Sequence, residues 1–442
     1  MAEIWELGAA EAAQRIADGS LSAEDLMRAL LARIDERDAA VGAWIHLDPD
    51  AALASARAAD DVQARGYGIG PLHGVPVAIK DIIETADMPT QNGYAPHENR
   101  HTHRDAFCVS QLRDAGAIVM GKTVTTELAT RHPGKTRNPV NPAHTPGGSS
   151  SGSAAAVRDG QVPIALGTQT GGSVIRPASF CGIHALKPTF GLIARAGVTM
   201  QADWLDTVGT YGRSIEDIAL AAEVMLARDL ADPQAIARSR SKLTVMANAE
   251  PPHRPRIAFM RGAMWDKADW AARTALEDFA ASLGDDCVEV DMPGWMAEAW
   301  QWQRVLQLYG NAIHYGPLWD ADGDAMSESL RKNIAEGREM TEAMYRTAIA
   351  QRDAVHEGLI RIYDDYDAIL CLASAGAAPE GLGWTGDPVF NAFWTYAGTP
   401  CVTLPLLTVD GLPMGVQLTG PRGSDGALLR TARWVENTGR SG

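Results

Sequence analysis

Short apolar runs bounded by glycine and proline are the feature that most restricts the fold of this chain. Residues 75–79, 117–120 and 162–166 are apolar throughout, without polar residues at alternate positions. Such a run is typical of a strand that is buried on both faces of a sheet. Helical patterns lie between these runs, at 106–115 and 153–158. This alternation predicts an α/β fold whose sheet is covered by helices on both faces.

The N-terminal segment is predicted to be a helical layer that packs on this core. Over residues 1–65, apolar side chains such as Leu26 and Leu30 recur at helical spacing. Ser22 and Asp25 match the capping box with which many helices begin.

The chain changes character after the core pattern at 70–232. A polar, proline-bearing stretch at 233–255 separates that pattern from a Trp- and Met-rich segment. We expect 235–365 to be helical and to cover the substrate. Later strand-like runs predict that 366–435 returns to the sheet. These runs are 368–372, 401–406 and 414–418.

The charge balance argues against a nucleic-acid partner. The chain has 39 basic and 55 acidic residues among 442, and a net charge of −16 repels phosphate groups and anionic lipid. Apolar residues make up 46% and charged residues 21%, which is typical of a globular protein. Neither a signal peptide nor a membrane-spanning stretch is recognisable, so we expect a cytoplasmic protein.

The five cysteines are scattered, and none forms a CxxC pair. This usage indicates neither a disulfide framework nor a cysteine zinc site, and it fits a reducing compartment. The cysteines are Cys108, Cys181, Cys287, Cys371 and Cys401.

Residues 116–123 match the phosphate-binding loop pattern letter for letter. That motif requires a strand before its first glycine and a flexible loop after it. Here 117–120 is itself the predicted strand, so we interpret the match as accidental.

His97 and His101 match the zinc-protease pattern HExxH, with His103 as a conceivable third ligand. Zinc binding by this pattern needs both histidines on one face of a helix. Gly93 and Pro96 precede a polar run without an apolar face, which favours an exposed loop. We therefore expect no metal site here.

Ser150 stands in the GxSxG pattern of the serine-hydrolase nucleophile elbow. The elbow must follow a strand, whereas 138–147 contains three prolines and predicts a loop. A Ser-His-Asp esterase with Ser150 as nucleophile stays an alternative, because candidate histidines exist. They are His184, His253, His314 and His356.

Two loops rich in serine and glycine lie inside the predicted core, at 146–153 and 167–173. Flexible linkers have this composition, but they lie between domains rather than next to buried strands. A glycine pair just before a serine lets successive backbone N–H groups point to one place. That arrangement can stabilise an oxyanion, so both loops are candidate catalytic loops.

Lys80 ends the first apolar run. Its ammonium group could reach water at the end of the strand. If the side chain is buried instead, desolvation lowers its pKa and favours a neutral amine that can act as a base.

Taken together, these segments resemble the amidase signature family, and most closely its malonamidase-like branch. The resemblance covers most of the chain outside 235–365. It implies a single α/β domain over 1–442, with a twisted mixed β-sheet core covered by helices. The matching blocks are residues 74–81, 146–156, 167–173, 181–182, 186–191, 205–209 and 398–405.

The resemblance also implies a role for each matching residue. Ser173 corresponds to the nucleophile, Ser149 to the bridging serine with a cis peptide bond, and Lys80 to the base. Together they would form the Ser–cis-Ser–Lys triad of that family. The oxyanion hole corresponds to the backbone of Thr170, Gly171, Gly172 and Ser173.

Three positions depart from the common pattern of the family and bear on substrate choice. Gln169 stands where many members carry Asp, Ser151 replaces a common Gly, and Arg176 lies one position later than usual. Arg176 is a candidate substrate contact, and so is Gln307 through the malonamidase-like resemblance. Arg176 has a second interpretation, in which it pairs with a buried carboxylate and holds the Ser173 loop.

The implied activity is hydrolysis of the C–N acyl bonds of small amides through an acyl-enzyme intermediate. Aryl amides and carbamates (urethanes) present a similar planar carbonyl, so the triad alone does not separate these substrates. No metal or organic cofactor is implied. An amidotransferase component that delivers ammonia to a charged transfer RNA is a further alternative, which the acidic balance and short chain disfavour. The expected partner is a small amide or carbamate, and a homodimer is left open.

Overall fold

An eleven-stranded mixed sheet forms the centre of the computed structural model, which describes residues 3–67, 70–236 and 242–439. Its strand order is β1-β3-β2-β4-β6-β5-β10-β11-β9-β7-β8. β2 pairs in parallel with β3 and β4, and β7 with β8 and β9. The other neighbours are antiparallel. The strands are β1 (Trp44–Leu47), β2 (Pro76–Lys80), β3 (Ile118–Thr123), β4 (Ile164–Gln169), β5 (His184–Lys187), β6 (Thr207–Gly212), β7 (Ile257–Phe259), β8 (Cys287–Glu289), β9 (Ala368–Leu372), β10 (Cys401–Val409) and β11 (Leu412–Thr419).

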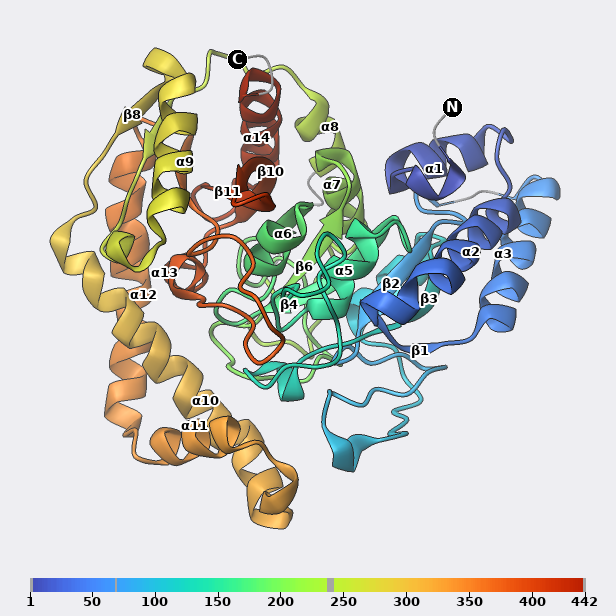
Figure 1. Cartoon of the computed structure of the whole chain (residues 1–442), viewed down its shortest axis with the longest axis horizontal. Coiled ribbons are helices and arrows are strands. Elements are labelled where there is room, and N and C mark those ends of the chain that lie inside the picture. The colour runs from blue at the N-terminus through green and yellow to red at the C-terminus, as the bar shows by residue number, and fades with distance from the viewer. Residues whose placement is uncertain (1–2, 68–69, 237–241, 440–442) are drawn as a thin grey trace.

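Helices surround this sheet, which confirms the predicted α/β fold. The N-terminal helices α1 to α3 (blue) lie on one side of the molecule, and α9 to α12 (yellow to orange) lie on the opposite side (Figure 1). α5 packs against β2, β3 and β4, and α6 packs against β10 and β11. The helices are α1 (Ala9–Ala17), α2 (Ala23–Val41), α3 (Pro49–Ala64), α4 (Phe107–Asp114), α5 (Ser151–Arg158), α6 (Ile175–Cys181), α7 (Ile215–Val224), α8 (Leu243–Asn248), α9 (Trp270–Ser282), α10 (Ala299–Ala321), α11 (Glu328–Arg338), α12 (Glu342–Tyr363), α13 (Val389–Ala397) and α14 (Asp425–Gly439).

The apolar runs of the sequence form three adjacent strands near the β1 end of the sheet. Every residue of β2, β3 and β4 is buried, because neighbouring strands and packed helices leave neither face open to water. β2 and β4 are parallel neighbours, so their carboxyl ends reach the same edge of the sheet. Lys80 ends β2 and Gln169 ends β4 at this edge, which brings the two candidate catalytic segments together.

Three strands lie in segments that we predicted to be helical, so that prediction is wrong for these residues. β1 interrupts the N-terminal layer and pairs antiparallel with β3, where Trp44 is buried and donates a hydrogen bond from Nε1 to Gln161 Oε1 at 2.7 Å. β7 and β8 extend the far end of the sheet from within 235–365. These strands have only three or four residues, which is too few for a periodic signal.

The capping box that we predicted at Ser22 is only half present. Ser22 accepts a hydrogen bond from the N–H of Asp25, whereas the N–H groups of Ala23 and Glu24 donate to Asp60 from α3. The aspartate of the next helix therefore completes the cap.

Parts of two sequence-based predictions cannot be compared with the structure. Met1 and Ala2, and residues 237–241 within the polar stretch, lie outside the described residues. Across the described ranges, no helix combines the length and the apolar character that crossing a membrane requires.

Candidate active site

Lys80 and Ser149 form the centre of the candidate site. Lys80 is completely buried, and its Nζ donates hydrogen bonds to Ser149 Oγ at 2.6 Å and to Thr168 Oγ1 at 2.8 Å. Burial lowers the pKa of Lys80 well below its ordinary value of 10.5, and the Asp206 carboxylate opposes this shift. The alternative in which Lys80 reaches water at the strand end is therefore wrong. The site instead holds an amine that loses its proton more readily than a free lysine does.

Hydrogen bonds to two successive carbonyl oxygens hold the loop that carries Ser149. The bond between Gly148 and Ser149 is cis. Gly148 O accepts a hydrogen bond from Arg176 Nη2 at 2.7 Å, and Ser149 O accepts one from the N–H of Thr126 at 3.2 Å. Ser151 begins α5 and donates from Oγ to Gly147 O at 2.7 Å.

Gln169 organises the loop that carries Ser173 between β4 and α6. Its Oε1 accepts hydrogen bonds from the N–H groups of Val174 and Ile175, at 2.8 and 3.0 Å. Its Nε2 donates to Thr395 Oγ1 at 2.9 Å. A neutral amide here both caps the first turn of α6 and donates to α13, whereas an ionised carboxylate could only accept.

The backbone before Ser173 presents unused N–H groups. Within the described residues, no hydrogen bond uses the N–H of Gly171, Gly172 or Ser173. The carbonyls of all three are engaged: Gly171 O by Thr395 Oγ1 at 2.7 Å, Gly172 O by the N–H of Arg176 at 3.0 Å, and Ser173 O by the Tyr211 hydroxyl at 3.0 Å. Both glycines are buried and Ser173 is half-buried. This arrangement can stabilise an oxyanion beside Ser173.

Asp206 connects the loop before Ser173 to the surroundings of Lys80, and no role was predicted for it from the sequence. Its Oδ1 accepts from Thr170 Oγ1 at 2.5 Å, and its Oδ2 accepts from the N–H groups of Gln201 and Ala202 at 2.6 and 3.1 Å. Burial raises the pKa of Asp206, and these hydrogen bonds oppose that shift. A signal was present in the sequence, because the matching block 205–209 contains this aspartate.

Arg176 holds two loops together from a completely buried position. It donates from Nε to Thr385 O at 2.8 Å and from Nη2 to Gly148 O. Burial lowers its pKa to about 10, and Asp387 opposes this shift. No carboxylate of the described residues forms an ion pair with Arg176, so two carbonyls stand where we considered a carboxylate. The Nη1 atom of Arg176 lies close to Gly172 and has no hydrogen-bond partner among the described residues.

The helical segment that we expected to cover the substrate reaches this loop through α10. Gln303 donates from Nε2 to Thr170 O at 3.2 Å and to Gln307 Oε1 at 3.1 Å. Gln307 is half-buried beside it, so the predicted contact residue lies one side chain away from the loop. Sequence reasoning missed Gln303, because only the fold brings it to Thr170.

Ser150 lies close to these loops but bonds to backbone atoms. Its buried Oγ donates to Thr168 O at 3.3 Å and accepts from the N–H of Thr168 at 3.2 Å. Three of the four candidate histidines face carboxylates elsewhere: His184 faces Glu436, His253 faces Asp367 and His314 faces Asp203. The geometry does not favour the elbow alternative.

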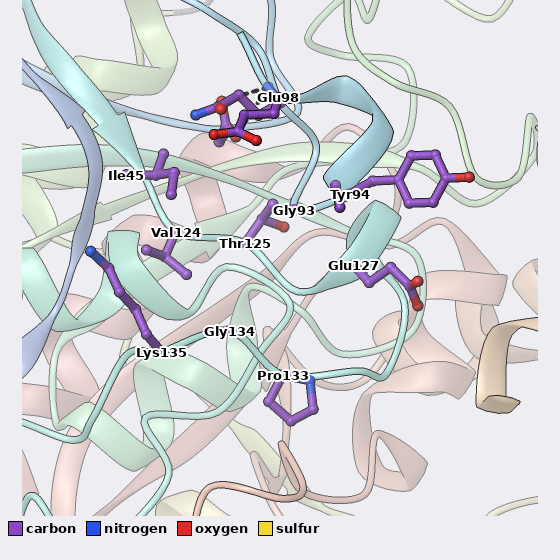
Figure 2. A pocket seen from close by; sticks show the side chains of 13 residues that line it. Ile45, Gly93, Tyr94, Glu98, Val124, Thr125, Glu127, Pro133, Gly134 and Lys135 are labelled. Atoms are coloured by element: carbon purple, nitrogen blue, oxygen red, sulfur yellow. Dashed lines mark hydrogen bonds between the residues drawn. The ribbon is translucent and has the colours of Figure 1, made fainter. Parts of the chain in front are cut away.

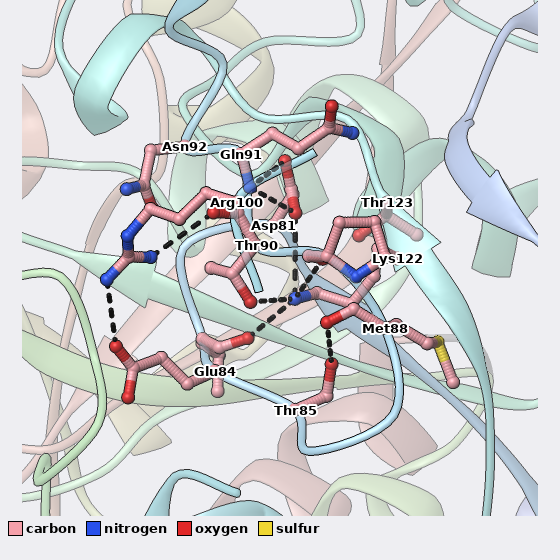
Figure 3. Close-up of polar contacts among 12 residues, drawn as sticks. Asp81, Glu84, Thr85, Met88, Thr90, Gln91, Asn92, Arg100, Lys122 and Thr123 are labelled. Carbon is pink, nitrogen blue, oxygen red and sulfur yellow. Dashed lines mark hydrogen bonds and ion pairs between the residues drawn. The ribbon is translucent and has the colours of Figure 1, made fainter. Parts of the chain in front are cut away.

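The phosphate-loop match falls in a strand, as the sequence analysis predicted. Lys122 belongs to β3 and is completely buried. Its Nζ donates to Ile83 O at 2.8 Å and Thr90 Oγ1 at 2.7 Å, and it lies 3.5 Å from Asp81 Oδ1 (Figure 3). A lysine held in this way is not free to reach a phosphate.

The zinc-protease match lies outside any α-helix. His97 ends a short 3₁₀ turn (Ala95–His97) and hydrogen-bonds to Asn92 Nδ2, while His101 lies in a loop and stacks on His103. Over the described ranges, no three His, Cys, Asp or Glu side chains are grouped to hold a metal ion.

Most of the chain matches a known protein family. The profile of the family described as Amidase matches residues 25–429. Among curated glutamyl-tRNA(Gln) amidotransferase A subunits, that of Chloroflexus aurantiacus is 31% identical to this chain. The alignment has 475 positions and covers 97% of this chain and 96% of that protein.

Solved structures share the whole fold. The peptide amidase from Stenotrophomonas maltophilia superposes with a TM-score of 0.84 at 29% identity, covering 98% of this chain and 97% of that chain. A protein from a vestigial complex that reveals the evolutionary origins of an s-triazine catabolic enzyme superposes with a TM-score of 0.90 at 28% identity. That match covers 98% of this chain and 99% of that chain.

Proposed function

Because the chain belongs to the amidase family, we propose that it hydrolyses the C–N bond of small amides with Ser173 as nucleophile, Ser149 as proton relay and Lys80 as base. The observation that supports this most is the 2.6 Å hydrogen bond between Lys80 Nζ and Ser149 Oγ, made by a completely buried amine. Burying a lysine destabilises the folded protein, so a completely buried lysine with a lowered pKa and a serine partner indicates a functional role. Catalysis by a neutral amine is such a role.

The proposed reaction proceeds through an acyl enzyme. Neutral Lys80 takes a proton from Ser149, which takes one from Ser173, and the Ser173 oxygen attacks the substrate carbonyl. The unused N–H groups of Gly171 and Gly172 would stabilise the negative charge on the carbonyl oxygen. The proton returns to the leaving nitrogen, and the C–N bond breaks. Water then hydrolyses the ester on Ser173 by the same proton route.

Arg176 suggests the class of amide. Its Nη1 is buried, positively charged and without a partner among the described residues, and it lies against Gly172 in the loop before Ser173. A carboxylate or second carbonyl on the acyl side of the substrate would satisfy this donor. Gln307 is the proposed second contact. Carbamates carry an additional oxygen next to the carbonyl and belong in the same substrate panel.

A second candidate function is that of an amidotransferase subunit, the role named for the curated relatives. The 31% identity to amidotransferase A subunits over 97% of this chain favours it. In that role the chain would be an amidotransferase component that delivers ammonia to a charged transfer RNA, and an amide such as glutamine would supply the ammonia. Hydrolysis of free glutamine that exceeds that of every other amide tested would favour this candidate.

Labelling of the nucleophile tests the proposal directly. The wild-type protein is treated with a fluorophosphonate, digested and analysed by mass spectrometry. We expect the label on Ser173, its loss in Ser173→Ala and its retention in Ser150→Ala. A label on Ser150 would instead establish the elbow alternative. Turnover of p-nitroanilides, small amides, carboxylate-bearing amides and carbamates then ranks the substrates.

A further inference from the structure

A cavity lies next to the segment that supports Ser149, and none of the proposed catalytic residues lines it. It has a volume of about 390 Å³, and its lining comes mainly from the edge strand β1, the segment after β3 and the loops at 91–98 and 133–135 (Figure 2). We propose that this cavity binds a small organic cation, a primary ammonium group on an apolar body. The proposal does not depend on the hydrolytic activity.

The apolar part of such a ligand has a matching wall. Ile45 from β1, Val124 after β3 and Pro133 line the cavity with hydrocarbon (Figure 2). Ile45 is 43% exposed although it belongs to a strand of the sheet. Covering these side chains would remove apolar surface from water, which favours binding.

Thr125 supplies a polar group without a partner in this wall. The residue is only 3% exposed, and no hydrogen-bond partner for its Oγ1 is present among the described residues. Figure 2 shows its hydroxyl among the lining side chains, beside Gly93 and Val124. A buried hydroxyl without a partner costs about 1–3 kcal/mol. An N–H donor from a ligand would recover that cost.

Two carboxylates give this end of the cavity its charge. Asp81 is buried and held by the N–H of Gln91, at 3.1 Å to each oxygen, and by Lys122 (Figure 3). Gln91 Oε1 in turn accepts from the N–H of Asn99, the neighbour of Glu98. Glu98 is exposed, and its carboxylate forms no ion pair in the described part of the chain. Glu127 and Lys135 also line the cavity, so its lining carries three carboxylates against one ammonium group and favours a cation over an anion.

The cavity is separate from the proposed active site, but the same segments of the chain border both. The segment 124–126 runs between the two, since Val124 and Thr125 line the cavity while the N–H of Thr126 donates to Ser149 O. Asp81 directly follows Lys80 in the chain. A ligand here would contact the back of the segment that holds Ser149.

Calorimetry with 4-bromobenzylammonium tests the proposal on the wild-type protein. We expect one saturable site, and at least tenfold weaker binding of the neutral match 4-bromobenzyl alcohol. Thr125→Val, which keeps the shape and removes the hydroxyl, should weaken the ammonium about tenfold. Glu98→Gln should weaken it about threefold, because an exposed charge contributes less. Glu298→Gln removes an exposed carboxylate elsewhere and should change nothing.

A crystal soaked with the same ammonium locates the site through the bromine signal. We expect bromine between Ile45 and Pro133. Three results would each overturn the proposal: the absence of saturable binding, equal affinity for the alcohol, or bromine at the Ser173 loop with affinity unchanged in both Thr125→Val and Glu98→Gln.

Discussion

The amine of Lys80 lies 2.6 Å from the hydroxyl of Ser149, and neither side chain has appreciable contact with water. Burial pushes the pKa of Lys80 well below 10.5, so the neutral form is present at lower pH than for a free lysine. Because the neutral amine is the proposed base, kcat/KM should rise with pH through one apparent pKa below 10.5. A rate profile without such a rise would contradict the assignment.

Lys80→Met should separate catalysis from stability. The substitution keeps the length of the side chain and removes the amine, so kcat/KM should fall by roughly two to four orders of magnitude. The melting temperature should stay the same or increase, because a costly buried amine is replaced by an apolar group. Both quantities are measured on the same preparation. A variant with near-native turnover at neutral pH would show that Lys80 is not the base.

Ser149→Ala should be nearly inactive, because it removes the hydroxyl that accepts from Lys80 and that we propose as the proton relay for Ser173. We expect a loss in kcat of roughly two to four orders of magnitude. Ser151→Ala is the matched control, since Ser151 lies in the same loop but hydrogen-bonds to Gly147 O. It should keep activity within about tenfold. Equal losses in both variants would indicate general damage to the loop.

Asp206→Asn should move the pH profile without abolishing activity. The Asp206 carboxylate favours the charged form of Lys80, so its removal should lower the pKa of Lys80 further. The rising limb of kcat/KM against pH should then shift to lower pH. The asparagine can still accept from the N–H groups of Gln201 and Ala202. A shift to higher pH would be inconsistent with the proposed electrostatic role.

The strands β2, β3 and β4 and the loops of the candidate site could be predicted because their signals are local. β2, β3 and β4 each contain a continuous apolar run, and Ser149 and Ser173 stand in glycine-rich loops that resemble those of a known family. β1 could not be predicted in the same way. Its four residues become a strand only because the edge of β3 is available for pairing.

Contacts between distant segments account for what the sequence analysis missed. Gln303 lies 133 residues from Thr170, and Arg176 lies 209 residues from Thr385. No periodicity links such pairs, because side-chain contacts across the chain depend on the assembled fold. Arg176 illustrates this best, since one of its two interpretations gave it a carboxylate partner and the structure provides two carbonyls.

Arg176→Leu should reduce stability and also change substrate preference. Two buried carbonyls, Gly148 O and Thr385 O, lose their donor, which should destabilise the protein by about 2 kcal/mol or more. If Nη1 also binds an acidic group of the substrate, kcat/KM for a carboxylate-bearing amide should fall about 100-fold more than for a neutral amide of the same length. Arg176→Lys keeps a charge without the planar fork, so its activity on the acidic amide should be intermediate. Equal losses on both amides in Arg176→Leu would mean that Arg176 only holds the loops together.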